Sequence, residues 1–185
     1  NVQKELVMGG KLHLVGDREL YNTAAELTRI MGHKNPDRFF NDPTAKDPQT
    51  GQPWVGDVGQ DIWEMIELVS RGSNHGWSVM EGSHVFHPNS KRGPTPVVAP
   101  IVEHHHTEAR SITGGYVYTG AKFPELQGVY LYGDYQYGKM WGLRYDHNAK
   151  KVVSHEELAD TTVKISSFGL GRDGSFYALD YRSEE

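Results

Sequence analysis

The sequence predicts an all-β fold made of short strands joined by turns. Its 185 residues include 21 glycines, 9 prolines and 10 tyrosines, and aromatic residues make up 11% of the chain. These proportions favour strands and turns over a helical bundle. A four-residue pattern that ends in Asp, usually after Gly, also recurs at residues 14–17, 54–57, 131–134 and 177–180. Such recurrence is typical of folds that repeat one supersecondary unit.

Composition excludes several functional classes. Lys and Arg total 19 against 24 Asp and Glu, and the resulting net charge of −5 argues against nucleic acid as a partner. No run approaches the ~18 apolar residues that a membrane span needs. The absence of cysteine removes disulfides, thiolate nucleophiles and Cys-ligated metals. We expect one domain, residues 1–185, and the absence of an initiator Met or signal peptide indicates a piece of a longer chain.

The N-terminal third predicts a strand, a helix and a loop. Residues 11–17 alternate in polarity and end on Gly-Asp, which suits a strand entering a turn. Thr23 and Glu26 form a capping-box pattern ahead of apolar residues at helical spacing, so a short helix is expected near 24–31. Residues 41–53 are almost entirely turn formers and predict a surface loop.

Strand signals continue along the rest of the chain. Residues 61–70 fit both a helix and a strand, and residues 82–101 predict a long surface loop. Further strands are expected at residues 116–118, 129–132, 140–145 and 176–179. Gly169–Gly174 resembles a dinucleotide-binding loop, but a strand-like segment follows it, so a hairpin turn is the better interpretation.

The spacing of the repeated pattern predicts a β-propeller. Its Asp residues are 40, 77 and 46 positions apart, and one blade takes roughly 40–50 residues. The spacings therefore suggest one, two and one blades, or three to four four-stranded antiparallel blades in all. Ordinary strand-end turns are the alternative origin of the pattern. A partial ring would expose blade edges, so we expect this chain to pair with the remaining blades or with another copy.

The segment 54–82 is richest in chemistry-bearing residues. Asp57, Asp61 and Glu64 lie close to Gly59 and Gln60, so carboxylates and backbone carbonyls could surround a hard cation such as calcium. The alternative is that these acids only face solvent. The turn at residues 72–77 suits either contact with a polar ligand or a structural turn whose Trp77 enters the core.

Three consecutive histidines suggest a second candidate site. Adjacent residues of an extended chain point to opposite faces, so only His104 and His106 could share a metal. A hydrogen-bonded or solvated cluster is the favoured alternative. No Ser-elbow or phosphate-binding loop accompanies these residues.

Several ordered motifs identify a family resemblance. They include Asn35-Pro36, Trp54-Val55-Gly56-Asp57-Val58-Gly59-Gln60, Gly72-Ser73-Asn74-His75-Gly76-Trp77, Glu81-Gly82, Ser111-Ile112-Thr113-Gly114-Gly115-Tyr116-Val117-Tyr118, Gly133-Asp134-Tyr135 and Ser167-Phe168-Gly169. In this order they resemble the glucose/sorbosone dehydrogenase family, most clearly over residues 33–182.

The resemblance implies a fold, a chemistry and a set of site residues. The fold would be a six-bladed propeller that holds pyrroloquinoline quinone and calcium, oxidises a sugar hydroxyl and passes electrons to an acceptor such as a cytochrome or quinone. Family members are usually exported, so a periplasmic or extracellular location is expected. Gly59 and Gln60 fall where backbone carbonyls bind the calcium. Lys34, Asn35 and Lys164 fall where the quinone is contacted.

Departures from the family pattern favour a second hypothesis. Lys34 stands where these enzymes often have Arg, Asp37 where they often have Gln, and Ser166 near an expected late Arg, so bidentate contacts with carboxylates would be lost. The family's catalytic His belongs to an earlier blade and is not identified in this chain. The alternative to an enzyme portion is a non-catalytic propeller module, similar to hedgehog-interacting-protein relatives, that binds carbohydrate or protein.

Overall fold

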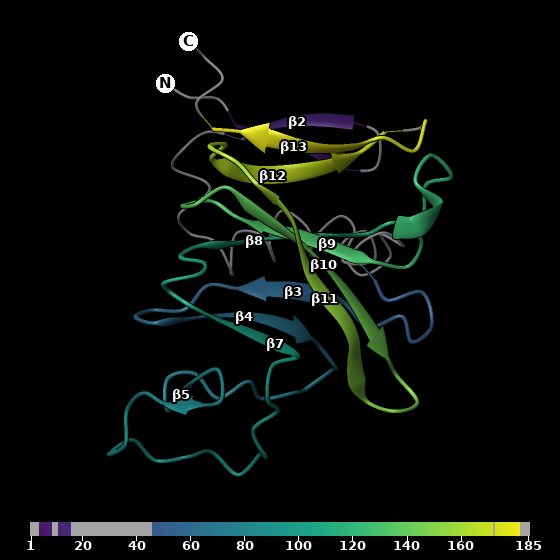
Figure 1. The fold of residues 1–185 in the computed structure, drawn as a ribbon. Helices are drawn as coiled ribbons and strands as arrows, with labels where there is room; N and C mark the ends of the chain where they lie inside the picture. Colours follow the sequence, from purple (N-terminus) through teal and green to yellow (C-terminus); the bar gives the residue numbers. More distant parts are fainter. Residues whose placement is uncertain (1–3, 9–10, 16–45, 172, 182–185) are drawn as a thin grey trace.

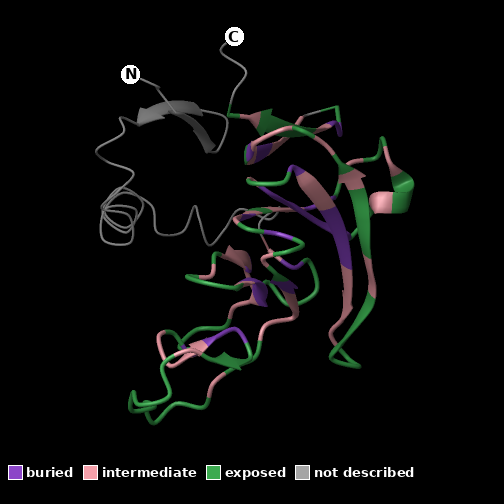
Figure 2. Ribbon diagram, turned by 60° about the vertical axis from the view of Figure 1, so that its left-hand side comes forward, coloured by how far each residue is buried: buried purple, intermediate pink, exposed green. Residues whose placement is uncertain are grey.

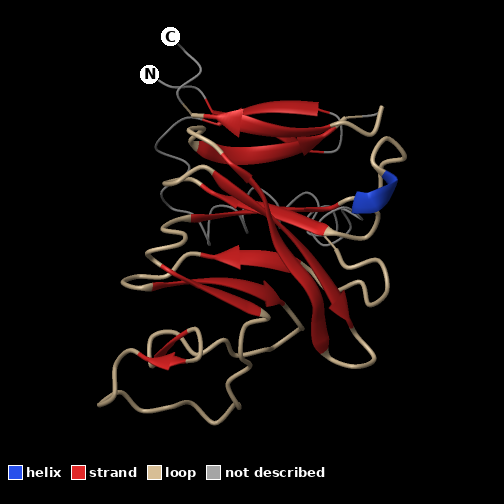
Figure 3. Cartoon of the chain, in the orientation of Figure 1, coloured by secondary structure: helices blue, strands red, loops and turns tan. Residues whose placement is uncertain are grey.

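Strands and the loops between them make up nearly all of the part of the chain that the structure describes. The structure, a computed structural model, describes residues 4–8, 11–15, 46–171 and 173–181 (Figure 1). In this part the helical content is one 3-10 turn, η1 (Pro124–Leu126), and the rest is strand and loop (Figure 3). The all-β prediction is confirmed. The helix expected near 24–31 lies outside the described residues.

One sheet forms a complete four-stranded antiparallel blade. Its order is β11-β10-β9-β8, from β8 (Ile112–Val117), β9 (Tyr130–Asp134), β10 (Lys139–Asp146) and β11 (Lys151–Asp160). Burial decreases outward from β9: every residue of β9 is buried, whereas β11 is mostly exposed (Figure 2). The polar sequence of β11 suits its position at the outer edge, where side chains meet water on both faces.

A second sheet precedes this blade and carries an insertion. Its order is β3-β4-β7, from β3 (Trp54–Asp57), β4 (Trp63–Leu68) and β7 (Val102–His105). Four consecutive residues of β4 are buried, so both of its faces are covered, which explains why its periodicity was ambiguous. The insertion, residues 69–101, contains only the short strands β5 (Met80–Glu81) and β6 (His84–Val85). The long loop expected at 82–101 is therefore correct apart from β6.

Two further pairs of strands complete the described chain. β12 (Ile165–Leu170) and β13 (Phe176–Asp180) form a hairpin, and the Gly171 and Gly174 amides close its turn on Ser175 O (2.7 Å) and Gly171 O (3.0 Å). The hairpin interpretation of this glycine-rich segment is thus correct. β1 (Lys4–Met8) and β2 (Lys11–Val15) form a separate antiparallel pair.

Hydrogen bonds between sheets show that β8 and β12 run parallel. Near their starts, Thr113 Oγ1 donates to Ile165 O (2.7 Å), and beyond their ends Tyr118 OH donates to Gly174 O (2.6 Å). Each is also the first strand of its sheet along the chain. They are therefore corresponding innermost strands of neighbouring blades.

β3 packs beside β8 but runs antiparallel to it. Trp54, at the start of β3, stacks on Tyr130 (5.0 Å between ring centroids), which is paired with Val117 at the end of β8. Glu64, near the other end of β3, accepts a hydrogen bond from Ile112 N (2.8 Å) at the start of β8. Because corresponding strands of neighbouring blades share a direction, β3 matches β9 and β13, the second strands of their blades.

The repeated sequence pattern therefore marks the second strand of each blade. It coincides with β3, with the end of β9 and with β13. The expectation that the 77-residue spacing holds two blades is wrong, because the insertion at 69–101 lengthens a single blade. Between residues 46 and 181 the described strands belong to three blades, of which β8–β11 has all four strands, and β1–β2 form a further pair.

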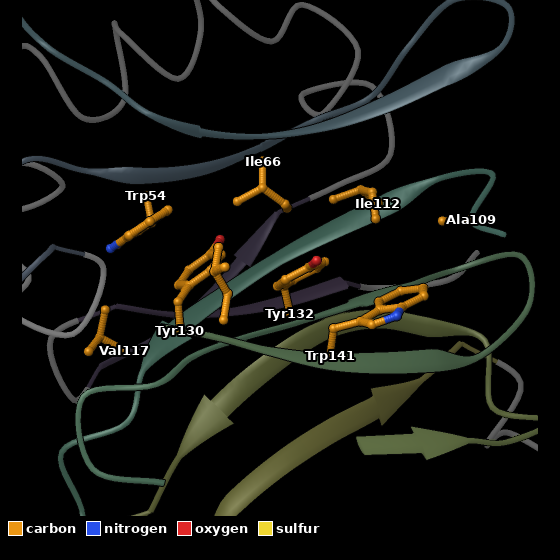
Figure 4. Close-up of a cluster of buried hydrophobic side chains, with 9 residues drawn as sticks. Trp54, Ile66, Ala109, Ile112, Val117, Tyr130, Tyr132 and Trp141 are labelled. Atoms are coloured by element: carbon orange, nitrogen blue, oxygen red, sulfur yellow. The ribbon is translucent and has the colours of Figure 1, made fainter. Parts of the chain in front are cut away.

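The core lies between the first two blades. Figure 4 shows its side chains, among them Trp54 and Ile66 from the first blade and Tyr130, Tyr132 and Trp141 from the second. The rings of Tyr130, Tyr132 and Trp141 follow one another in a stacked row, with centroids 5.7 and 5.5 Å apart. Gly56 permits this close packing, since a Cβ there would lie 2.6 Å from Ile112 Cγ2. The two blades therefore pack as one body.

Candidate cofactor and metal site

Strand directions bring four loops to one end of the blades. Each second strand ends there and each innermost strand begins there, so the end is formed by loops 58–62, 106–111, 135–138 and 161–164. Gly59 and Gln60 lie in the first of these loops and Lys164 lies in the last. The predicted metal and cofactor residues of the described chain thus share one end of the fold. Lys34, Asn35 and Asp37 lie outside the described residues.

The Asp of the repeated pattern anchors these loops. Asp134 is fully buried and accepts hydrogen bonds from Arg110 N and Ser111 N (2.6 Å each), directly before β8, and from Tyr137 N. Asp180 accepts from Lys164 N (3.0 Å), directly before β12. In both blades the Asp at the end of the second strand therefore fixes the chain that enters the innermost strand.

The Gly59–Gln60 loop is held by a buried carboxylate that the sequence did not single out as a site residue. Glu81 is 3% exposed and accepts hydrogen bonds from Asp61 N (2.6 Å) and Ile62 N (3.2 Å). Ile62 O in turn accepts from His106 N (2.8 Å). A Cβ on Gly59 would lie 1.7 Å from Trp63 O, so this close turn requires glycine. Glu81 was missed because it acts on residues about twenty positions away.

Lys164 is turned toward the neighbouring loop of the same end. Its Nζ donates to Gln136 O (2.5 Å), and its own amide is bound by Asp180. Ser166 is exposed on β12 and its hydroxyl donates to Leu179 O (3.2 Å). Lys164 therefore supplies positive charge at this end, whereas Ser166 supplies none.

Comparison with known proteins identifies the family. The family model for Glucose / Sorbosone dehydrogenase matches residues 8–184. The chain belongs to this family. Two solved structures share its fold: a glucose dehydrogenase (TM-score 0.55, 23% identity, covering 72% of this chain and 38% of that one) and the soluble aldose sugar dehydrogenase of Escherichia coli in the apo-form (0.54, 19%, covering 74% and 40%).

Curated relatives of this family member are plant and cyanobacterial proteins. HIPL1 protein of Arabidopsis thaliana is 38% identical over 111 residues, which cover 53% of this chain and 16% of the relative. The uncharacterized protein slr1608 of Synechocystis is 26% identical over 150 residues, covering 80% and 35%. The chain therefore spans about a third or less of these relatives.

The histidine cluster of this family member is a hydrogen-bonded network. His106 Nε2 lies 2.8 Å from Glu64 Oε1, and Glu64 is fully buried, which raises its pKa despite the bonds from Ile112 N and His106. His104 Nε2 lies 2.7 Å from Tyr132 OH, which also lies 2.6 Å from His155 Nε2. The hydrogen-bonded interpretation of His104 and His106 is confirmed. Among the described residues, no three His, Asp or Glu side chains are grouped to hold a metal.

The turn at residues 72–77 differs at Trp77 from the expectation of a structural turn. Trp77 does not enter the core: it is 58% exposed and stacks on Phe86 (5.2 Å between ring centroids). His75 turns inward instead, with Nδ1 2.8 Å from Glu67 Oε2 and Nε2 2.8 Å from Ser73 Oγ.

In the described part of the chain, no helix is long and apolar enough to cross a bilayer.

Proposed function

We propose that this chain supplies the calcium- and quinone-binding end of a sugar dehydrogenase propeller. The observation that carries the proposal is the Gly59–Gln60 loop, a glycine-dependent turn held by hydrogen bonds to Glu81. The family resemblance implies calcium-binding carbonyls in this loop. When bound, calcium would polarise a carbonyl of pyrroloquinoline quinone, which would accept hydride from the sugar carbon. The proton-accepting His and the electron acceptor, a cytochrome or quinone, would come from outside this chain.

The donor chemistry of the loop fits calcium. Calcium is a hard cation that takes oxygen ligands, including backbone carbonyls. Within residues 46–171 and 173–181, no hydrogen bond reaches the carbonyl oxygen of Gly59 or of Gln60. Lys164 would offer its ammonium to a carboxylate of the quinone at the same end, and Lys34 and Asn35 complete the proposed contacts. A periplasmic or extracellular location goes with this proposal.

A second candidate function is a non-catalytic propeller module that binds carbohydrate or protein. Two observations favour it: Lys164 Nζ is already engaged by Gln136 O, and Ser166 leaves its position without charge. The likeness to HIPL1 protein and to HIPL2 protein of Arabidopsis, 30% identical over 128 residues, also fits this alternative.

Titration with calcium and then pyrroloquinoline quinone separates the two functions. We expect the unaltered chain to bind the quinone only with calcium, as monitored by the quinone absorption. Gly59→Ala should bind calcium at least tenfold more weakly, because its Cβ would displace the loop. Gly93→Ala is the matched control, since nothing lies within 4 Å of a Cβ there. Absence of calcium-dependent quinone binding by the unaltered chain would move the assignment to the non-catalytic module.

We also propose that the chain associates with further blades or with a second copy. Among the described residues, β3 has a strand partner on one edge only, and the β12–β13 blade has two strands. Unpaired edges of this kind favour strand addition. Analytical ultracentrifugation is expected to show an assembly larger than 20.8 kDa. A folded, monodisperse monomer at all concentrations would contradict this.

A further inference from the structure

We infer that Glu81 is the positioning residue of the cation loop and that it turns the carbonyl oxygens of Gln60 and Asp61 outward as a pair of ligands. The inference rests on the proposed calcium site and assigns two groups to it for which the family resemblance implies no role, Asp61 O and the Glu81 carboxylate. It follows from the planarity of two consecutive peptide bonds.

In a trans peptide, the carbonyl oxygen and the following N–H point in opposite directions. Asp61 N–H points at Glu81 Oε1 and Ile62 N–H at Glu81 Oε2. The oxygens on the same two peptide planes, Gln60 O and Asp61 O, must therefore point away from the buried carboxylate. Gln60 and Asp61 are exposed, so these oxygens face the end of the blades rather than the interior.

Two further contacts fix the frame in which these peptides sit. Ile62 O is bound by His106 N, so the next carbonyl along the chain is committed to the interior of the fold. On the other side, Gly59 packs against Trp63 O, and its would-be Cβ also lies 3.0 Å from Glu81 Oε1. The loop is thereby clamped at both ends, and Glu81 is the group that the two converging amides share.

The two peptide dipoles are oriented so that their negative ends could bind a cation. Two N–H groups converging on one carboxylate form a polar cradle, and the negative ends of the same peptide dipoles lie on the opposite side. A hard cation there meets two oriented carbonyl oxygens without any rearrangement of the loop. Loss of Glu81 would leave both amides without their acceptor and free the peptides to rotate.

Glu81→Gln in the full chain tests the inference by two measurements. Terbium luminescence, sensitised by Trp63 beside the loop, and calcium competition report cation affinity. Amide hydrogen exchange of Asp61 and Ile62 reports whether the loop is held. We expect a cation affinity at least tenfold weaker and amide exchange at least tenfold faster, since a Gln can offer only one oxygen acceptor to the two amides. Glu81→Asp, which keeps the charge on a shorter stem, is expected to restore affinity in part.

The matched control is Glu103→Gln. Glu103, on β7, is also a carboxylate that holds the 69–101 insertion. It accepts hydrogen bonds from Ser83 N (2.5 Å) and Ser83 Oγ (2.6 Å) and none from the 58–62 loop. It should leave cation affinity unchanged. Normal affinity in Glu81→Gln, with quinone binding intact in the unaltered chain, would overturn the inference and spare the proposed function. Absence of cation binding in the unaltered chain would overturn the ligand pair and the proposed function, while amide exchange would still decide whether Glu81 holds the loop.

Discussion

Asp134→Ala is expected to lower the free energy of unfolding by about 3–5 kcal/mol, because a fully buried carboxylate that satisfies three amides is removed. Arg110 N and Ser111 N would lose their acceptor in the loop before β8, and Tyr137 N would lose it in the loop after β9. Each amide left without an acceptor costs about 1–3 kcal/mol, and Asp134 serves three of them.

Urea denaturation, monitored by circular dichroism, measures this loss. The free energy of unfolding of Asp134→Asn should lie between those of the unaltered protein and Asp134→Ala, because one oxygen acceptor remains. Asp146→Ala is the matched control. Asp146 also accepts two backbone amides, Asn148 N and Ala149 N at 2.9 Å each, but it does so at the solvent-exposed turn between β10 and β11. It should shift the midpoint little. Equal midpoints for Asp134→Ala and Asp146→Ala would show that the buried amides find other partners.

The role of Asp134 also shows how far the sequence could predict this fold. The repeated pattern was visible because its four residues are contiguous and coincide with β3, with the end of β9 and with β13. Its spacing miscounted the blades, since nothing local distinguishes an insertion between β4 and β7 from a further blade. β11 was missed for another reason: its exposed, polar residues have neither apolar alternation nor a buried face.

Sequence likewise predicts the contiguous part of the candidate site and not its long-range contacts. Gly59 and Gln60 were found because a glycine turn and its neighbours form one contiguous motif. Glu81 and Asp134 act on backbone amides about twenty residues away, and sequence spacing carries no signal for such contacts. At Trp77 a local property was misleading: its apolar character favoured burial, but His75, two positions earlier, takes the inward position.

Glu67→Gln is expected to abolish a loss of stability that accompanies rising pH. Glu67 is 4% exposed, and burial, followed by the nearby charge of Asp57, raises its pKa from 4.5 to about 7. The folded state therefore binds this proton more tightly than the unfolded state between pH 4.5 and 7, so the free energy of unfolding falls as pH rises through that window. A shift of this size corresponds to about 3 kcal/mol, which is lost in full above pH 7.

The contacts of His75 explain why the neutral form of Glu67 is favoured. Burial lowers the pKa of His75, which favours the neutral form of its imidazole beside Glu67. Ser73 Oγ donates to Ser70 O, so the imidazole proton lies on Nε2 and is donated to Ser73 Oγ. Nδ1 then carries no proton and faces Glu67 Oε2 at 2.8 Å, a separation that suits a neutral carboxyl group better than two like lone pairs.

A glutamine at position 67 can face His75 Nδ1 without ever becoming charged. Chemical denaturation at pH 4.5 should give similar free energies for both proteins, whereas at pH 8 the Glu67→Gln protein should be more stable by about 3 kcal/mol. Glu156→Gln, on the exposed strand β11, is the control and should run parallel to the unaltered protein. The same parallel behaviour in Glu67→Gln would mean that Glu67 is ionised in the fold at pH 4.5, and that His75 is then its charged partner.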